Sequence, residues 1–259
     1  MLIKSDNKNY IEFIDTPWNS KVLGFKTNEI TQIRFTKEEI LSELMREFEE
    51  FSCSNNYFFS GIRIQPENLT LRKVLTKTGY NQVETIFELT KKFDSIKYSS
   101  DILETDINLR IAEESDTEKI VDIVRCILHH GRFFEDPKID NQIAVERNIN
   151  WVKSFCDKKT VFAGEFETDI IGFLAFDINK DLCVLQLGGV KEEFNFLAYP
   201  FWLKSFIYLH ELYNVTRFNT IISAYNLPII ALYNYFGFIY KSVSIGFHKH
   251  RSPKDDPVQ

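Results

Sequence analysis

Apolar residues in the second half of the chain gather in short, β-rich segments that polar turns separate. Such a pattern is typical of strands, and the three consecutive segments in the middle predict an antiparallel meander. The predicted strands cover residues 109–111, 160–165, 170–177, 182–190, 216–224 and 238–247.

Helix signals stand between these predicted strands. Apolar residues recur at the i, i+3, i+4 and i+7 positions within residues 116–128, and the Ser-x-x-Glu pattern of residues 115–118 matches a capping box. A proline at the start of residues 200–213 suits the first turn of a second helix. A third helix should lie between Asn226, a favourable N-cap, and Gly237, a residue type that often ends helices.

A polar run over residues 91–108 separates these elements from an N-terminal part with strong apolar patterning of its own. We place a domain boundary within this run. The sequence therefore predicts an N-terminal α/β domain over residues 1–105, a second α/β domain over residues 106–250 and a disordered tail over residues 251–259.

The two halves share a short pattern. Asn68 precedes Gly79 by 11 residues, as Asn226 precedes Gly237, and strand-like segments flank both copies. One interpretation is that the N-terminal half is a degenerate copy of the C-terminal half. The other is that a strand, a capped helix, a glycine and a strand form a common αβ pattern without further meaning.

Composition excludes several classes of protein. Hydrophobic residues make up 44% of the chain and charged residues 26%, as expected for a folded protein with a real core. The net charge of −6 argues against a nucleic-acid partner, because such proteins need a basic surface to neutralise phosphates. The 24 Phe residues predict cores and pockets that are built from rings.

Neither the N-terminus nor the cysteines indicate export or metal binding. The first residues turn polar at once, unlike a secretory signal, and the most apolar stretch, residues 194–203, is about half as long as the ~20 residues of a membrane span. The cysteines are too widely spaced to signal a zinc site or a disulfide framework. We therefore expect a cytoplasmic protein with no metal and no membrane partner. The cysteines are Cys53, Cys126, Cys156 and Cys183.

The order of the predicted elements and the residues at both ends of the second half resemble the GNAT acetyltransferase superfamily. Residues 109–116 match a common opening of that fold, while Asn226, Ala231, residues 232–233 and residues 236–238 match its acyl-CoA segment. The resemblance implies an α/β fold with a C-terminal GNAT domain, built from a mixed, mostly antiparallel sheet with flanking helices. It also implies acyl-CoA as the co-substrate.

Tyr233 is the candidate catalytic residue of that segment. It follows Asn226 by seven residues, about two helical turns, so both side chains project from nearly the same face. The resemblance implies that Asn226 lines the arm of CoA and that Tyr233 is the general acid for the departing thiolate. A phenol suits that role because it stays protonated at neutral pH. The alternative is a packed core tyrosine.

The end of the third meander strand, Leu187, Gly188 and Gly189, is the candidate for contacts with the thioester. Two glycines permit a bulge or splay through which a backbone amide can approach the thioester oxygen. Such a donor would stabilise the oxyanion of the tetrahedral intermediate. An ordinary strand end is an equally good interpretation.

The glycine-rich loop that holds the pyrophosphate of CoA in the superfamily has no counterpart in residues 191–200. Asn195 tolerates a positive φ and can replace one glycine. The amides of Ala198 and Tyr199 can point at phosphate from a helix N-terminus. The missing glycines also motivate a non-enzymatic alternative, a degenerate GNAT that serves as a binding module.

Residues 129–137, together with Trp151, form the candidate acceptor site. They resemble the sugar-nucleotide N-acyltransferase branch of the superfamily, which includes dTDP-fucosamine acetyltransferase. Arg132 offers a planar set of donors for phosphate, and Phe133 and Phe134 offer rings for a sugar or base. The alternative is a loop with core phenylalanines and a surface ion pair.

The resemblance to this branch implies transfer of an acetyl or short hydroxyacyl group from acyl-CoA to the amine of a dTDP-linked deoxyamino sugar, for surface polysaccharide synthesis. His130 and Glu135 are the candidate general bases, although a chain of waters can also take the proton. A different amine, on a protein N-terminus or an antibiotic, is the alternative acceptor. The partners are then the nucleotide sugar and acyl-CoA, and a homodimer stays open.

Overall fold

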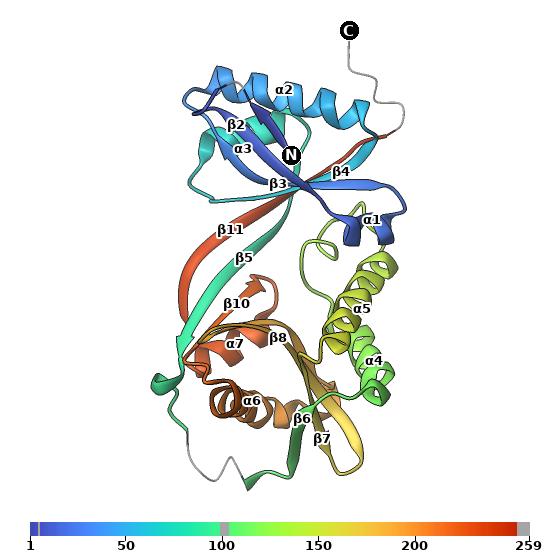
Figure 1. The fold of residues 1–259 in the computed structure, drawn as a ribbon, viewed down its shortest axis with the longest axis vertical. Coiled ribbons are helices and arrows are strands. Elements are labelled where there is room, and N and C mark those ends of the chain that lie inside the picture. Colours follow the sequence, from blue (N-terminus) through green and yellow to red (C-terminus); the bar gives the residue numbers. More distant parts are fainter. Residues whose placement is uncertain (5, 99–103, 253–259) are drawn as a thin grey trace. The chain divides into compact units, whose positions relative to one another are not determined.

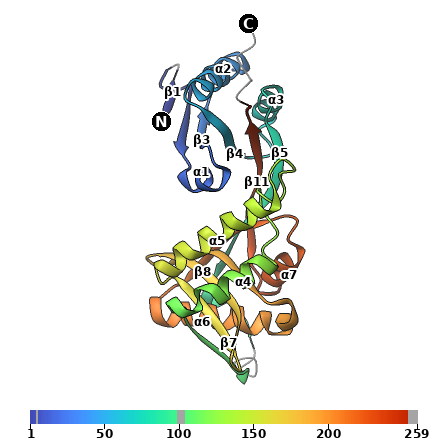
Figure 2. The same ribbon diagram turned by 90° about the vertical axis from the view of Figure 1, so that its right-hand side faces the viewer.

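The computed structural model describes residues 1–4, 6–98 and 104–252 (Figures 1 and 2). Its strands are β1 (Leu2–Lys4), β2 (Tyr10–Asp15), β3 (Lys26–Arg34), β4 (Tyr57–Ile64), β5 (Asn81–Lys92), β6 (Ile107–Ile111), β7 (Val161–Phe166), β8 (Asp169–Asn179), β9 (Leu182–Val190), β10 (Arg217–Ser223) and β11 (Ile239–His250). Its α-helices are α1 (Pro17–Leu23), α2 (Glu38–Ser54), α3 (Leu69–Lys77), α4 (Thr117–Ile127), α5 (Asn141–Asp157), α6 (Ala198–Tyr213) and α7 (Leu227–Tyr235). Short 3₁₀ helices are η1 (Phe93–Ser95), η3 (Glu114–Asp116) and η4 (Glu192–Leu197).

The chain forms two compact units, and each is discontinuous in sequence. Unit 1 contains residues 1–86, residues 135–139 and the C-terminal segment from residue 243, and unit 2 contains residues 87–134 and 140–242. The predicted division after residue 105 is linear. The compact units differ from it because strands β5 and β11 each carry residues of both units.

Unit 1 is a sheet with the strand order β1-β2-β3-β4-β11-β5. β3 and β4 run parallel, and the end of β11 pairs antiparallel with β4. Helices α2 and α3 bury their apolar faces together with residues of this sheet in one hydrophobic core. From these two helices the core takes Leu41, Leu44, Met45, Phe48, Leu71, Val74 and Leu75.

Unit 2 continues with the strand order β5-β10-β9-β8-β7-β6. Strands β7, β8 and β9 are antiparallel neighbours, which confirms the predicted meander, whereas β9 and β10 are parallel. Helices α4 and α5 cover one face of this sheet, and α6 and α7 cover the other (Figure 1). The result is a mixed α/β architecture with two hydrophobic cores, one on each face.

Alternate residues of β8 belong to the two different cores. Phe173 and Ala175 pack with α4 and α5, whereas Leu174 and Phe176 pack with α6. Successive side chains of a strand point to opposite faces, so a sheet that is covered on both sides needs apolar residues at every position. This explains the continuous apolar run of residues 170–176.

The most apolar stretch of the chain forms the junction of η4 with α6. Helix α6 buries seven residues, among them Phe201, Trp202 and Phe206, against the sheet of unit 2. Packing therefore accounts for the apolar composition of this segment. Within residues 1–4, 6–98 and 104–252, no helix is both long enough and apolar enough to cross a membrane.

The start of α4 differs from the prediction. A 3₁₀ turn precedes the helix, and the capping box joins Glu113 with Asp116 rather than Ser115 with Glu118. Asp116 is buried and also accepts hydrogen bonds of 2.5 and 3.0 Å from Arg110. The carboxylate of Asp116 thus serves both the helix cap and the ion pair with Arg110 of β6. The Ser-x-x-Glu pattern of residues 115–118 does not predict this ion pair.

The strand–helix–strand repeat is present in the structure as β4-α3-β5 and β10-α7-β11. Asn68 and Asn226 each accept a hydrogen bond from the backbone N–H three residues further on. Gly79 and Gly237 follow the helices with φ of +85° and +69°, a conformation that favours glycine. The first strand of each copy neighbours the last strand of the other, β4 beside β11 and β10 beside β5. This reciprocal exchange supports the interpretation of two related halves.

Arg251, the first residue of the predicted tail, is instead anchored in unit 1. Its guanidinium donates two hydrogen bonds of 2.9 Å to the carboxylate of Glu49 and one of 2.7 Å to the hydroxyl of Ser60. The residue is 7% exposed, so the ordered chain extends past the predicted boundary. The rest of the predicted tail, residues 253–259, lies outside the described residues.

Candidate functional site

Strands β9 and β10 begin as a parallel pair and then separate. Their register ends with Leu185 opposite Thr220, although β9 continues to Val190 and β10 to Ser223. Within the described part of the chain, the edge of residues 186–190 that faces β10 has no strand partner in this register. Backbone groups that a neighbouring strand does not use can bind a ligand.

A bulge lies on the opposite edge of β9. The register with β8 skips Gln186, whose side-chain Nε2 donates a hydrogen bond of 2.9 Å to Asp177. Bulges bend a strand and increase its twist, which accounts for the separation of β9 from β10 at this point. The sequence pattern predicts the irregularity at Gly188 and Gly189, and the structure places it two residues earlier.

Gly188 and Gly189 have a packing role in this structure. A Cβ atom at Gly188 would lie 2.8 Å from Leu174 Cδ1 and 3.3 Å from Trp202 Cζ2, and one at Gly189 would overlap Ile127 Cδ1. Because neighbouring residues of a strand face opposite sides, Gly188 makes room for α6 and Gly189 makes room for α4. Close helix packing therefore explains both glycines.

The hydroxyl of Tyr233, a residue of α7, lies next to the point where β9 and β10 separate. It accepts a hydrogen bond of 3.4 Å from Nε1 of Trp202, and the hydroxyl of Thr220 is also within hydrogen-bonding reach. The side chain is 3% exposed. Burial raises the pKa of Tyr233 to about 12, and the polar contacts with Trp202 and Thr220 oppose this change only in part. The phenol therefore stays protonated at neutral pH and can act as a donor.

Aromatic side chains from α6 and the end of α7 pack against one another in unit 2. Tyr199, a predicted phosphate contact, stacks on Phe236 with 4.6 Å between ring centroids and meets Tyr235 edge to face at 4.8 Å. Trp202 is 2% exposed. The rings of this region thus bear out the expectation that the aromatic content builds the cores.

The predicted phosphate contact of the Ala198 amide needs correction. Helix η4 runs directly into α6, and the backbone N–H of Ala198 donates to the carbonyl of Asn195. This amide is therefore already bonded within the chain. The first turn of the combined segment instead carries Glu192 and Glu193, whose negative charges repel a phosphate. Asn195 itself is exposed.

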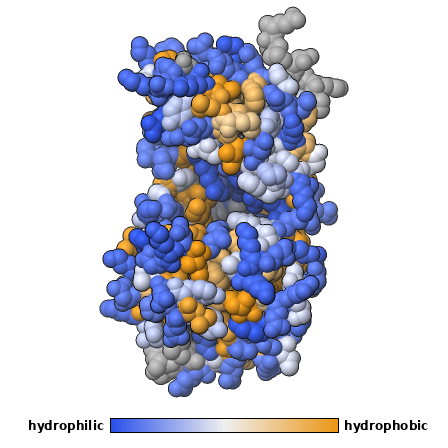
Figure 3. Space-filling model, in the orientation of Figure 1, coloured by the Kyte–Doolittle hydropathy of each residue, from blue (hydrophilic) through white to orange (hydrophobic). Residues whose placement is uncertain are grey.

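Asn226 acts as the N-cap of α7, since its Oδ1 accepts a hydrogen bond of 3.3 Å from the N–H of Ile229. Nearly every residue of α7 is apolar, yet only Tyr233 is buried, and Leu227 and Tyr235 are 68% and 74% exposed. Apolar patches also appear between polar residues on the molecular face in Figure 3. A contact of Asn226 with CoA stays a prediction.

The predicted acceptor residues Phe133 and Trp151 are joined by Arg147. The guanidinium carbon of Arg147 lies 4.6 Å from the ring centroid of Phe133 and 5.4 Å from that of Trp151. Such cation–π contacts hold the two rings in place. Phe133 is 3% exposed and Arg132 is 9% exposed, so both are packed side chains, whereas Trp151 is half-buried.

The other residues of the acceptor segment lie in different environments. Phe134 is half-buried and meets His129 edge to face, with 5.8 Å between ring centroids. His130 is exposed, next to Gly131 with its φ of +105°. Glu135 is half-buried and belongs to unit 1, whereas His130 belongs to unit 2. Their roles as general bases stay predictions.

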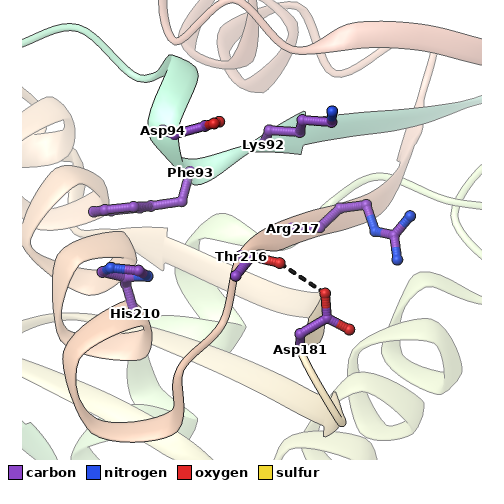
Figure 4. A pocket seen from close by; sticks show the side chains of 7 residues that line it. All are labelled: Lys92, Phe93, Asp94, Asp181, His210, Thr216 and Arg217. Atoms are coloured by element: carbon purple, nitrogen blue, oxygen red, sulfur yellow. Dashed lines mark hydrogen bonds between the residues drawn. The ribbon is translucent and has the colours of Figure 1, made fainter.

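A pocket of about 380 Å³ opens at the other end of β9 and β10, where the two strands begin. In Figure 4 the ring of Phe93 faces the imidazole of His210, and the centroid distance is 4.0 Å. Thr216 donates a hydrogen bond of 2.7 Å to Asp181. This pocket lies away from Tyr233 along the strands and mixes acidic with basic groups. Its lining residues are Lys92, Phe93, Asp94, Asp181, His210, Thr216 and Arg217.

No family model matches the chain, and no curated protein matches it significantly in sequence. Solved structures match its fold over most of its length. A conserved protein of unknown function from Staphylococcus epidermidis has a TM-score of 0.67 at 10% identity and covers 97% of this chain and 94% of its own. A GCN5-related N-acetyltransferase from Sphaerobacter thermophilus has a TM-score of 0.64 at 12% identity, with coverage of 94% and 76%.

A tandem GNAT protein from the clavulanic acid biosynthesis pathway matches with a TM-score of 0.57 at 11% identity, and the match covers 88% of this chain and 76% of that one. The chain has the GNAT fold. The predicted fold class is therefore confirmed. At such low identities the likeness concerns the fold alone, so the roles of individual residues rest on the geometry of this chain.

Three residues of this GNAT-fold site were not predicted, namely Gln186, Trp202 and Thr220. Gln186 and Thr220 matter through their register with neighbouring strands, and a linear sequence does not contain that register. The sequence does contain one indication of the contact that Trp202 makes. A large ring on an apolar helix packs closely against a strand only where the strand has a small residue, and Gly188 is such a residue.

Proposed function

We propose that the chain is an acyl-CoA-dependent N-acyltransferase whose active site lies in unit 2, at the separation of β9 and β10. The observation that carries this proposal is the position of the Tyr233 hydroxyl at that separation. This protonated donor lies beside the edge of β9 that β10 leaves unpaired. The pantetheine arm of CoA can hydrogen-bond to such an edge as an additional strand would. The GNAT acetyltransferases among the structural neighbours support the same class of reaction.

The reaction is direct acyl transfer. The amine nitrogen attacks the thioester carbonyl, the new C–N bond forms and the C–S bond breaks with its electron pair leaving on sulfur. Backbone amides of Leu187, Gly188 or Gly189 stabilise the oxyanion, and Tyr233 donates to the departing thiolate. His130 or a water takes the proton that the amine loses.

For the acceptor we infer the amine of a dTDP-linked deoxyamino sugar, used in surface polysaccharide synthesis. Support comes from the resemblance of the segment around Arg132 to the sugar-nucleotide branch. Phe134 and Trp151 are only half-buried, which leaves them within reach of a sugar or base. Because Arg132 is packed, we expect it to act at the wall of the acceptor site rather than as an open phosphate clamp.

The test is release of free CoA from acetyl-CoA and short hydroxyacyl-CoA donors. The acceptor panel contains dTDP- and UDP-linked amino sugars, a peptide N-terminus and an aminoglycoside. We expect turnover with a dTDP-amino sugar. Turnover with the peptide or the aminoglycoside alone would overturn the acceptor assignment while keeping the acyltransferase. No release with any acceptor would contradict the enzyme itself.

A second candidate is a GNAT-fold binding module that does not turn over. The hydrogen-bonded amide of Ala198 and the two carboxylates in the first turn of η4 favour it, because both lower the expected affinity for the pyrophosphate of CoA. Calorimetric titration with CoA separates the candidates. Binding without turnover would support the module, and turnover would exclude it.

A further inference from the structure

Three side chains with metal-binding chemistry converge within unit 1. They are Asp136, His248 and His250, and one donor atom from each lies within 4.8 Å of the other two. His248 Nδ1 and His250 Nε2 both lie 2.7 Å from the same atom, Asp136 Oδ2. Two imidazoles and a carboxylate therefore point at one small volume.

The local structure fixes each of these donors. His248 and His250 alternate on β11, so both rings project from the same face of the strand, and pairing with β4 holds their backbone. The ring of Phe59 packs edge to face against both imidazoles, with centroid distances of 4.6 and 5.1 Å. Asp136 Oδ1 accepts a hydrogen bond of 3.0 Å from the N–H of Lys138. A metal site benefits from such supporting contacts because they orient its ligands in advance.

Burial distinguishes the three side chains. Those of Asp136 and His248 are 3% and 1% exposed, whereas that of His250 is 20% exposed. Two of the three side chains are thus buried, and solvent reaches the cluster at His250. An ion held there would keep a coordination position for water or another small ligand.

We propose that Asp136, His248 and His250 bind a divalent transition-metal ion, for which Zn²⁺ is the best probe. Two imidazole nitrogens and one carboxylate oxygen form a ligand set that suits Zn²⁺ and related ions, whereas Mg²⁺ and Ca²⁺ prefer oxygen ligands alone. Zinc–ligand bonds of about 2.0–2.2 Å in a tetrahedron place the donor atoms roughly 3.3 Å apart. Small rotations that open the present 2.7 Å contacts reach that spacing.

Metal binding requires that ring protons move. Each imidazole nitrogen that now faces Asp136 must present its lone pair to the metal, so its proton passes to the other ring nitrogen or to solvent. The ion would then link the segment of residues 135–139 to β11 inside unit 1. The cysteine spacing led to the expectation of no metal, whereas the His-x-His spacing of residues 248–250 on a strand is a signal for one.

The test titrates the chelator-treated full chain with ZnCl₂ in a calorimeter. We expect one Zn²⁺ per chain, and His250→Gln or Asp136→Asn should each weaken binding by at least about 100-fold, the upper range for changes to supporting residues. His129→Gln is the matched control, because it removes an exposed imidazole outside the cluster. Cys126→Ser is the second control, because an exposed free thiol can also take zinc. Both controls should bind like the wild type.

A second measurement uses the wild-type chain alone, so that the test does not depend on whether the variants fold. Co²⁺ bound to this cluster should give visible d–d bands without a sulfur-to-cobalt charge-transfer band, since no ligand is a thiolate. No saturable binding, a thiolate band, or unchanged affinity in folded His250→Gln and Asp136→Asn would overturn the proposal. The cluster would then be a hydrogen-bonded triad only. The titration contains neither acyl-CoA nor an amine, so its result is independent of the proposed acyl transfer.

Discussion

The indole nitrogen of Trp202 donates a hydrogen bond to the hydroxyl of Tyr233 over 3.4 Å. Since that hydroxyl accepts from the indole, its own proton must point toward another acceptor. Burial keeps the proton in place by raising the pKa of Tyr233 to about 12. The pair therefore presents a neutral donor, which suits the proposed role of Tyr233 toward a thiolate leaving group.

Replacement of Tyr233 by Phe should lower turnover on the order of 10²-fold, with little change in CoA affinity. The physical reason is that Phe keeps the ring that packs against Phe238 but removes the donor to the thiolate. Steady-state kinetics and calorimetric titration with CoA measure the two quantities separately.

Tyr240→Phe is the matched control for this experiment. Tyr240 is 42% exposed, and its hydroxyl donates a 3.0 Å hydrogen bond to Asn234, so the same substitution removes a hydrogen bond outside the site. Turnover of this variant should stay near the wild-type value. An unchanged kcat in Tyr233→Phe would remove the donor role.

The raised pKa of Tyr233 also predicts a loss of stability at high pH. The folded chain holds this proton more tightly than the unfolded chain, so the contribution is fully present below about pH 10 and is lost as the pH rises through 12. The difference between about 12 and 10 corresponds to roughly 2–3 kcal/mol of unfolding free energy.

Tyr57 titrates in the same range, because burial raises its pKa to about 12 as well, and burial also raises the pKa of Tyr80. The measurement is therefore a difference between wild type and Tyr233→Phe, taken from denaturant unfolding between pH 9 and 12. The wild type should lose more stability than the variant. Parallel curves for the two proteins would show that Tyr233 titrates normally.

The fold was predictable where local patterns decide the structure. The meander strands and the helix that Asn226 caps followed from apolar, β-rich runs, turn residues and cap chemistry, all of which act over a few residues. The start of α4 could not be predicted in this way, because Asp116 both closes the helix cap and binds Arg110 of β6. Local patterns also gave no sign that β5 and β11 carry residues of both compact units.

Several residues of the candidate site could be named from the sequence, whereas their contacts could not. Tyr233 is singled out by the resemblance of its segment to the acyl-CoA segment of the GNAT superfamily, whereas its partner Trp202 lies 31 residues away on another helix. The Ala198 amide looked available because the sequence does not reveal that η4 continues into α6 and bonds it. The chemical type of each side chain is known from the sequence. Whether a donor is already hydrogen-bonded depends on contacts that form only when the chain folds.

The glycine pair of β9 gives a prediction about packing. Gly189→Ala should destabilise the chain by about 1–3 kcal/mol, because the added methyl group overlaps Ile127 Cδ1. Ile127→Val removes that atom and alone should cost about 0.5–1.5 kcal/mol. The double variant should then be more stable than the sum of the single effects predicts, as urea unfolding can measure. Strict additivity would show that the overlap is relieved elsewhere.

The two helix caps allow the clearest separation of structure from function. Asn68 caps α3 and Asn226 caps α7 through equivalent hydrogen bonds, so either Asn→Ala change should cost about 1 kcal/mol of stability. Only Asn226 belongs to the copy that carries Tyr233. The matching residue of the first copy is Leu75, which is fully buried and has no proton to donate.

We therefore expect one CoA per chain, and we expect Asn226→Ala to weaken its binding while Asn68→Ala leaves it unchanged. Calorimetry with protein of known active concentration gives both the stoichiometry and the affinity. A stoichiometry near two would contradict the view that the first half is a scaffold. Equal losses of affinity in both variants would mean that the caps act only through stability, because a role in ligand contact must distinguish α7 from α3.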